Sequence, residues 1–313
     1  MKLSKHQKAI LAVAICTIIW SAAAPIFKWS LQETPPFTLV FFRFFIATLI
    51  MFPIVIKKIK IRFEDFYKIL LLTLTGITFN ISFVYLGLTL AQSINAPIIA
   101  SSTPIFLIIG SIIFFHELPK VKEIIGTIVS LIGVLIIVVR PIDHLPLHGF
   151  IIGNLFFVLS ILSLVCYTLL FKKFKLSYAP TTLLFWMFLL GSITTFPQFL
   201  SEARTTNSLA TLDFRGSFGI IYGAILSSIL GQFFYNFAVK HLKTDEVGIF
   251  SLLGPVVTAL VAIPLLHEQI TFAYLLGSVF VFLGLIIAEV KLHYHPFHHL
   301  VNQNDDSWLE SGP

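Results

Sequence analysis

The sequence predicts an all-α integral membrane protein with ten transmembrane helices in two inverted-topology repeats of five helices. The first observation is composition: of 313 residues, 57% are hydrophobic and 12% are charged, and the mean hydropathy is +0.94. Soluble domains carry about 25% charged residues, so most of this surface cannot face water. The second observation is a series of long apolar runs, and the third is a segment that occurs twice.

The apolar runs are long enough to cross a bilayer, which takes about 20 mostly apolar residues per helix. The first run resembles a secretory leader, but it continues through Pro25 and Trp29, so we expect it to stay in the protein. The ten predicted spans cover about residues 8–31, 35–56, 66–89, 93–115, 122–140, 148–171, 179–199, 217–239, 246–266 and 271–290.

The basic residues between these spans predict the orientation, because Lys and Arg concentrate on the cytoplasmic side. Of the 21 Lys and Arg residues, sixteen fall on one side and three, Arg140, Arg204 and Arg215, fall on the other. The remaining two, Lys28 and Arg43, lie within spans. The sixteen are Lys2, Lys5, Lys8, Lys57, Lys58, Lys60, Arg62, Lys68, Lys120, Lys122, Lys172, Lys173, Lys175, Lys240, Lys243 and Lys291. We therefore expect both termini in the cytoplasm and the protein in a bacterial inner membrane. The same clustering explains the net charge of +6 without a nucleic-acid partner.

A repeat is visible around two His-Glu pairs, FFHELP at His116-Glu117 and LLHEQI at His267-Glu268. With the resulting offset of 151 residues held fixed, Pro104 aligns with Pro255, Gly126 with Gly277, and Gly133 with Gly284. Five spans per repeat is an odd number, so the second repeat must enter the membrane from the opposite face. We expect a first repeat over residues 1–145, a second over 146–292, and a flexible cytoplasmic tail over 293–313. Inverted repeats are the common architecture of secondary transporters.

The chain resembles the drug/metabolite transporter superfamily in its EamA-type branch of ten-span proteins. The residues that carry the resemblance are Trp20-Ser21, RFFIA at 43–47, Pro104, Glu117, Gly126 and Gly133, with Pro255, Glu268, Gly277 and Gly284 in the second repeat. The resemblance implies solute transport, with a substrate such as an amino acid or a nucleotide-related metabolite. Two departures are the His before each Glu, where the family usually has a small residue, and Met187 near the position that matches Arg43.

Polar and aromatic residues within the spans are the candidates for a solute cavity, because polar groups in a membrane are costly and usually face a cavity or a partner helix. Arg43 is the most unusual of them; it could bind an anionic group, cap carbonyls of a broken helix, or extend outward to water. The cavity candidates are Trp20, Arg43, Tyr85, Asn95, Ser102, Tyr167, Gln232, Tyr235 and Asn236.

Pro104 and Pro255 fall at matched positions within the fourth and ninth spans, so they are hinge candidates. Glu117 and Glu268 each end one of these spans and are expected to cap or orient the next helix. The fifth and tenth spans are almost wholly apolar, with glycines seven residues apart. Glycine at such spacing lets helices approach closely, so we expect scaffold helices and a possible homodimer contact there.

Motifs for hydrolysis, ATP binding, zinc proteolysis or dinucleotide binding are absent from the sequence, so we expect no catalytic residue, no resident metal and no cofactor. The best hypothesis is a secondary transporter that moves a small metabolite across the lipid bilayer by alternating access. Two alternatives stay open: a sensor or assembly subunit without transport activity, and an integral membrane enzyme that uses His116 and Glu117.

Overall fold

The computed structural model describes residues 4–115, 119–139, 147–206, 213–242, 250 and 253–289, and this part of the chain is helical with no strand. Seven of its helical stretches are long and apolar enough to cross a membrane. An eighth is a helix pair bent by 42° at a short break, and two shorter apolar helices follow near the end. The all-helical membrane fold is thus confirmed, while the number of spans and their orientation stay predictions.

A helix lies at each of the ten predicted ranges. The first five are α1 (Lys5–Ser30), α2 (Pro36–Val55), α3 to α4 (Phe63–Thr73 and Asn80–Leu90), α5 to α6 (Asn95–Ser101 and Thr103–Phe115) and α7 (Val121–Val139). The second five are α8 (Leu147–Phe174), α9 (Pro180–Thr206), α10 to α11 (Phe214–Ile221 and Gly231–His241), α13 (Gly254–Leu266) and α14 (Phe272–Glu289).

Two of these stretches contain wide π-helical turns. The segment Leu74–Phe79 joins α3 to α4, and Tyr222–Leu230 joins α10 to α11. Such turns are rare and occur often at functional sites. Each lies in the third helical stretch of its half, and each carries a glycine, Gly76 and Gly223, against which a side chain of another helix packs.

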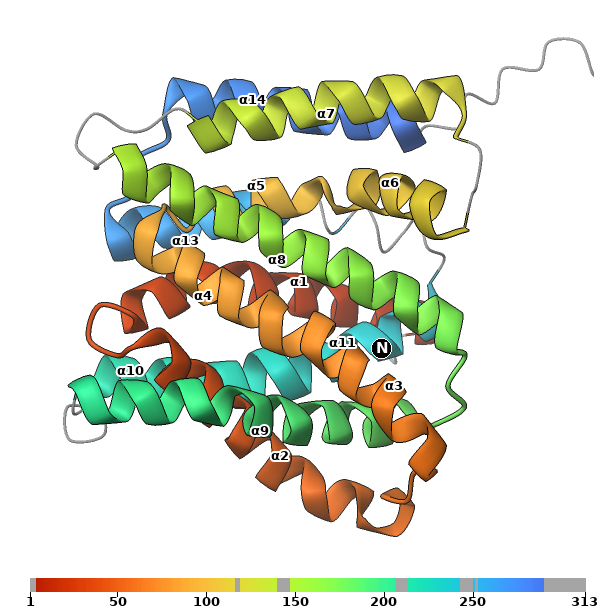
Figure 1. Ribbon diagram of the computed structural model, residues 1–313. Coiled ribbons are helices and arrows are strands. Elements are labelled where there is room, and N and C mark those ends of the chain that lie inside the picture. Colours follow the sequence, from red (N-terminus) through yellow and green to blue (C-terminus); the bar gives the residue numbers. More distant parts are fainter. Residues whose placement is uncertain are drawn as a thin grey trace, which may run out of the picture.

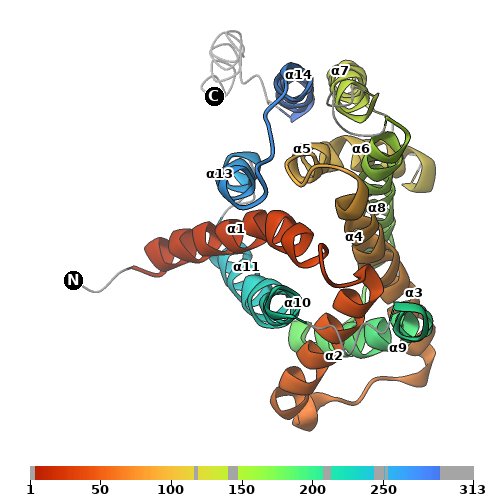
Figure 2. The ribbon, with the colours of Figure 1, turned by 90° about the vertical axis from the view of Figure 1, so that its left-hand side faces the viewer.

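The helices pack in layers that Figures 1 and 2 show from the side and from one end. The pair α7 and α14 forms one outer layer, and the pair α2 and α9 lies at the opposite side. Between them, α4 packs on α8, and α1 packs on both α11 and α13. Each of these pairs brings together distant parts of the sequence, so the two halves of the chain are interleaved.

The contact between α7 and α14 depends on four glycines. A Cβ at Gly126 would lie 2.5 Å from the Gly284 carbonyl oxygen, and one at Gly133 would lie 2.6 Å from that of Gly277. The predicted close approach is therefore present, but it joins two helices of one chain. A homodimer through this layer would have to use the outward faces, which expose residues such as Ile128 and Val279.

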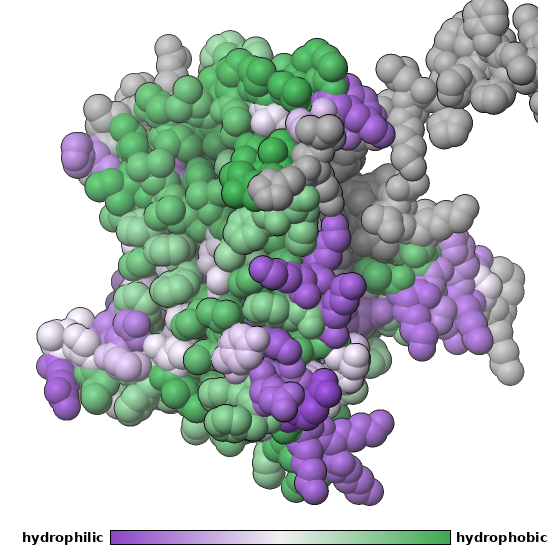
Figure 3. Space-filling view, turned by 45° about the vertical axis from the view of Figure 1, so that its right-hand side comes forward, coloured by the Kyte–Doolittle hydropathy of each residue, from purple (hydrophilic) through white to green (hydrophobic). Residues whose placement is uncertain are grey.

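Large apolar side chains cover the sides of the bundle. Ile18, Ile54 and Val256 are each more than half exposed, as lipid-facing residues of a membrane helix are. In Figure 3 apolar residues cover most of the upper left part of the space-filling surface, and hydrophilic residues gather mainly in its lower and right-hand parts.

Helix α9 runs to Thr206, well past the end at about residue 199 that its apolar run predicts. The extra turns are polar, and they place Glu202 against the start of α2. Its carboxylate accepts hydrogen bonds from the backbone N–H groups of Phe37 and Thr38, at 3.1 and 2.8 Å, and from the Thr38 hydroxyl. These amides are unpaired donors at a helix N-terminus, so the extension supplies the cap that Pro35 cannot.

Candidate functional site

A cavity of about 410 Å³ lies inside the bundle, between helices of both halves of the chain. It is lined from the first half by Trp20 and Phe27 of α1, Arg43 of α2 and Tyr85 of α4, and from the second half by residues that include Tyr167. Its size suits a small organic ligand, since such sites measure about 300–1,000 Å³.

Arg43 is the one ionisable Lys, Arg, His, Asp or Glu side chain among the described residues that line this cavity, and only 7% of it is exposed. Its Nε donates to the Ser228 hydroxyl at 3.0 Å, Nη2 donates to Ser227 at 3.1 Å, and Nη1 makes a longer contact of 3.5 Å to the Tyr85 hydroxyl. Within the described residues, no carboxylate lies within 4.0 Å of the guanidinium.

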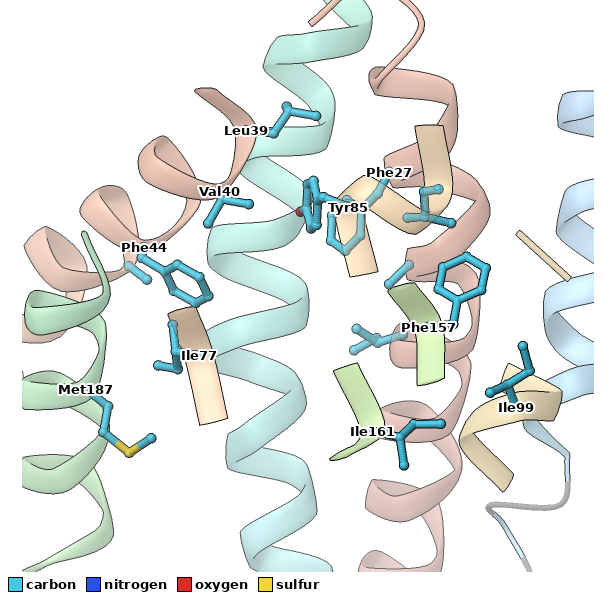
Figure 4. Close-up of a cluster of buried hydrophobic side chains, with 14 of the residues drawn as sticks. Phe27, Leu39, Val40, Phe44, Ile77, Tyr85, Ile99, Phe157, Ile161 and Met187 are labelled. Atoms are coloured by element: carbon cyan, nitrogen blue, oxygen red, sulfur yellow. The ribbon is translucent and has the colours of Figure 1, made fainter. Parts of the chain in front are cut away.

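Two aromatic rings lie close to the guanidinium. Its central carbon lies 5.0 Å from the centre of the Phe27 ring and 5.2 Å from that of Phe44. Tyr85 stacks on Phe27, with ring centres 5.0 Å apart, and Figure 4 shows these rings within the buried apolar cluster. A cation at the centre of a membrane helix costs about 3 kcal/mol on insertion scales. Hydroxyls and rings offset part of that cost, but no acidic group among the described residues neutralises the charge.

A second cavity of about 360 Å³ adjoins the first. Trp20, Ala24 and Val84 line both cavities. The second cavity also reaches the broken α5–α6 stretch through Pro97 and Ser101, and the start of α13. The two cavities therefore form neighbouring compartments along α1, with Trp20, Ala24 and Val84 between them in common.

Of the nine predicted cavity residues, five line the first cavity: Trp20, Arg43, Tyr85, Tyr167 and Gln232. The structure places the other four elsewhere. Asn95 bonds to Asn154 between α5 and α8, and the Ser102 hydroxyl bonds to the Ile99 carbonyl. Tyr235 packs beside the Trp20 ring, and Asn236 accepts a hydrogen bond from Gln232.

The prolines proposed as hinges are each the second residue of a helix, Pro104 in α6 and Pro255 in α13. Pro104 follows the 42° break between α5 and α6, and Pro255 lies in the first turn of α13. Pro255 also lines the second cavity. A proline lacks the N–H that would continue a helix across such a break.

Glu268 lies in a buried polar cluster that joins three segments, namely the end of α1, the α4–α5 connection and the end of α13. Its carboxylate accepts hydrogen bonds from the Lys28 ammonium at 2.8 Å, from the Ser93 N–H and hydroxyl at 2.7 and 2.9 Å, and from the Ile94 N–H at 3.1 Å. Lys28 also donates to the Ala91 carbonyl oxygen at 2.6 Å. Glu268 thus bonds to the segment before α5, whereas the sequence predicts that it orients the helix that follows it. Glu117 and His116, its counterparts in the first repeat, lie outside the described residues.

Several lining residues were absent from the predicted set. Asn80 donates to the Ser160 carbonyl oxygen at 2.7 Å and faces the cavity, and Ser227 holds Arg43. The cavity is also lined by three phenylalanines, Phe27, Phe44 and Phe188. Large apolar residues fill every span, so the sequence does not distinguish these three as cavity residues.

The fold and this buried site define a polytopic helical membrane protein with an internal solute-sized cavity. Comparison with known families then identifies it: a model of the EamA-like transporter family matches residues 7–139 and, separately, 151–289. The chain belongs to this family and is a membrane transporter. This membership also removes the basis for the enzyme hypothesis.

Individual relatives agree with that assignment. An uncharacterized transporter of Archaeoglobus fulgidus is 28% identical over 91% of this chain and 100% of its own length. A probable amino-acid metabolite efflux pump of Escherichia coli is 26% identical over 92% of this chain and 97% of its own. A solved structure described only as a crystal structure of protein shares the fold, with a TM-score of 0.60 at 15% identity over 90% of this chain and 95% of that one.

Proposed function

We propose that this protein is a ten-span secondary transporter that moves a small metabolite, such as an amino acid or a nucleotide-related solute, across the inner membrane by alternating access. The observation that carries the proposal is the buried cavity around Arg43, which takes its walls from both halves of the chain. A site between two repeats can open to either side as the repeats rock against each other.

The helix contacts support two repeats related by a two-fold axis. If each helix is replaced by its counterpart in the other half, the α4–α8 pair becomes the α11–α1 pair, and α6–α8 becomes α13–α1. The pairs α2–α9 and α7–α14 are their own counterparts. The separate family matches to each half point the same way.

Closure at one end of the bundle is supported by the Glu268 cluster, which ties together segments that flank the second cavity. Its side chain is 4% exposed, and Lys28 reaches it from α1, so this end is held by charge-assisted hydrogen bonds. Alternating access requires such contacts to break when the site opens to that side. The predicted orientation makes this the outer face.

Flux measurement in proteoliposomes tests the proposal. The purified full-length chain would be reconstituted and offered radiolabelled amino acids, nucleotides, and neutral and cationic metabolites, with protein-free vesicles as the control. We expect saturable flux of at least one solute, faster when unlabelled solute is present on the other side, because exchange bypasses the return of the empty carrier. Folded protein that gives no saturable flux with any solute overturns the transport proposal.

The named relative supports amino-acid-related solutes, since the protein from Escherichia coli is described as a probable amino-acid metabolite efflux pump. The direction of transport in this chain is a separate question, which the same vesicles answer by loading the solute on one side only.

A further inference from the structure

We propose that Arg43 is the anchor for a single carboxylate on the transported solute, and that the solute has an apolar or aromatic body. This inference rests on the proposed function and names the substrate class of the same cavity. It is carried by the charge, the free hydrogen-bonding capacity and the lining of that cavity.

The positive charge of Arg43 favours an anionic ligand. Arg43 is buried, faces the cavity and has no carboxylate partner among the described residues. An ionisable residue inside a membrane marks a substrate or ion pathway unless a partner accounts for it. A bound carboxylate would supply the negative charge that the described residues do not provide, and Arg binds carboxylates through two parallel hydrogen bonds.

Donors remain available to such an anion. A guanidinium has five N–H groups, and the three contacts to Ser227, Ser228 and Tyr85 use one each. The serines also fix the guanidinium from the α10–α11 side, so its position is set before the solute arrives. The Tyr85 hydroxyl accepts from Arg43 and donates to no described protein group, which leaves its own hydrogen for the anion.

A single positive charge also limits the substrate. A phosphate monoester carries nearly two negative charges at neutral pH, and no further Lys, Arg or His is among the described lining residues. Binding a nucleotide would leave one of its negative charges without a cationic partner among the described lining residues. The site therefore favours a monocarboxylate over the nucleotide-related solutes that the broader proposal includes.

The rest of the cavity fits an apolar body with few polar groups. Trp20, Phe44, Tyr167 and Phe188 supply most of the aromatic wall. Asn80 and Gln232 use their amide nitrogens on Ser160 and Asn236, so their carbonyl oxygens can accept hydrogen bonds from an amino group of the solute. Both an amino acid and its deaminated acid are thus within the class, and the carboxylate is the group that they share.

The test compares ligands that differ in one group. Wild-type protein in detergent would be heated with phenylalanine, phenylalaninamide, 3-phenylpropionate or adenosine monophosphate, and the same compounds would be assayed for flux in vesicles. We expect the two carboxylates to raise the unfolding temperature and to be transported. The amide, which lacks the carboxylate, and the nucleotide should bind at least tenfold more weakly. Phenylalanine and 3-phenylpropionate differ in the amino group, so comparing them shows whether the site requires an amino acid or accepts a simple carboxylic acid.

Variants test the role of Arg43 itself. Arg43→Gln should lower the affinity for the carboxylates at least tenfold. Arg43→Lys keeps the positive charge but cannot make two parallel hydrogen bonds, so its affinity should fall by less. Arg215→Gln is the matched control, because Arg215 is partly exposed and lies outside the cavity. If Arg43→Gln does not fold, the Arg43→Lys variant and the comparison of acid with amide in wild-type protein still test whether the site binds a carboxylate.

The outcomes separate the two proposals. Flux of the amide or the nucleotide equal to that of the acids, or full carboxylate affinity in folded Arg43→Gln, overturns the carboxylate anchor and leaves transport standing. Flux confined to solutes without a carboxylate does the same. Absence of flux for every solute in the wider panel overturns the transport function instead.

Discussion

The Lys28 ammonium lies 2.8 Å from the Glu268 carboxylate, across 240 positions of sequence, and the carboxylate is almost fully buried. Three further hydrogen bonds from Ser93 and Ile94 converge on the same two oxygens. This relationship holds α1, the α4–α5 connection and α13 together, and it gives the first prediction.

Glu268→Gln should destabilise the protein, because an amide cannot neutralise Lys28 and its NH₂ group faces donors. Removing one partner of a fully buried pair costs about 3–5 kcal/mol. Lys28 is a quarter exposed, so we expect about 2 kcal/mol, seen as a lower unfolding temperature in detergent. Glu33→Gln is the control, because Glu33 is exposed and its ion pair with Arg215 is long, at 3.9 Å, so its loss should cost little. Equal losses in the two variants would contradict the role of the cluster.

Glu202→Gln should loosen the start of α2. The Phe37 and Thr38 amides would lose a charged acceptor, and a helix N-terminus favours negative charge, so the expected cost is about 1 kcal/mol. Hydrogen exchange measured by mass spectrometry should become faster in the peptide that holds these two amides. The peptide that covers the middle of α9 serves as an internal reference. Unchanged exchange at α2 would show that the cap contributes nothing.

Alanine at Gly126 or Gly284 should force α7 and α14 apart. The added Cβ would lie 2.5 Å from the Gly284 carbonyl oxygen in the first case and 2.4 Å from the Ser130 amide nitrogen in the second. Backbone atoms cannot move aside as a flexible side chain can, and overpacking costs about 1–3 kcal/mol.

Gly254→Ala is the matched control for these glycine variants, since its nearest neighbour would be the Ser21 hydroxyl oxygen at 3.4 Å. The unfolding temperature in detergent should fall for the α7 and α14 variants and change little for Gly254→Ala. A Gly126→Ala protein as stable as the Gly254→Ala protein would contradict the packing argument.

The sequence predicts much of the helical layout because apolar runs determine where membrane helices lie. The ten helix positions follow from this pattern. The glycines of α7 and α14 predict a close helix approach, but not that these two helices of one chain make it with each other. The end of α9 does not, since its last turns are polar and form through a contact with α2. Hydropathy predicts which segments face lipid. It does not predict a helix cap that is supplied by a residue of a distant helix.

The candidate site is predicted only in part, for a related reason. Arg43 and Gln232 stand out because polar groups are rare in apolar spans, and both line the cavity. Asn95 stands out equally, yet it bonds to Asn154 in a helix contact. The π-helical turn at Leu74–Phe79 also changes which residues of its stretch share a helix face. A prediction that assumes 3.6 residues per turn throughout the stretch therefore misassigns that face.

The last prediction concerns the inverted repeat and uses Lys120 and Gln269, which follow the two His-Glu pairs. Single cysteines at these positions, in a background where Cys16 and Cys166 are replaced, would be labelled in intact cells with a membrane-impermeant thiol reagent. If the second repeat enters the membrane from the opposite face, Gln269→Cys should react from outside. Lys120→Cys should react only after the membrane is permeabilised, because Lys-rich segments stay in the cytoplasm. Labelling of both from the same side would rule out inverted topology, and with it the symmetric rocking on which alternating access depends.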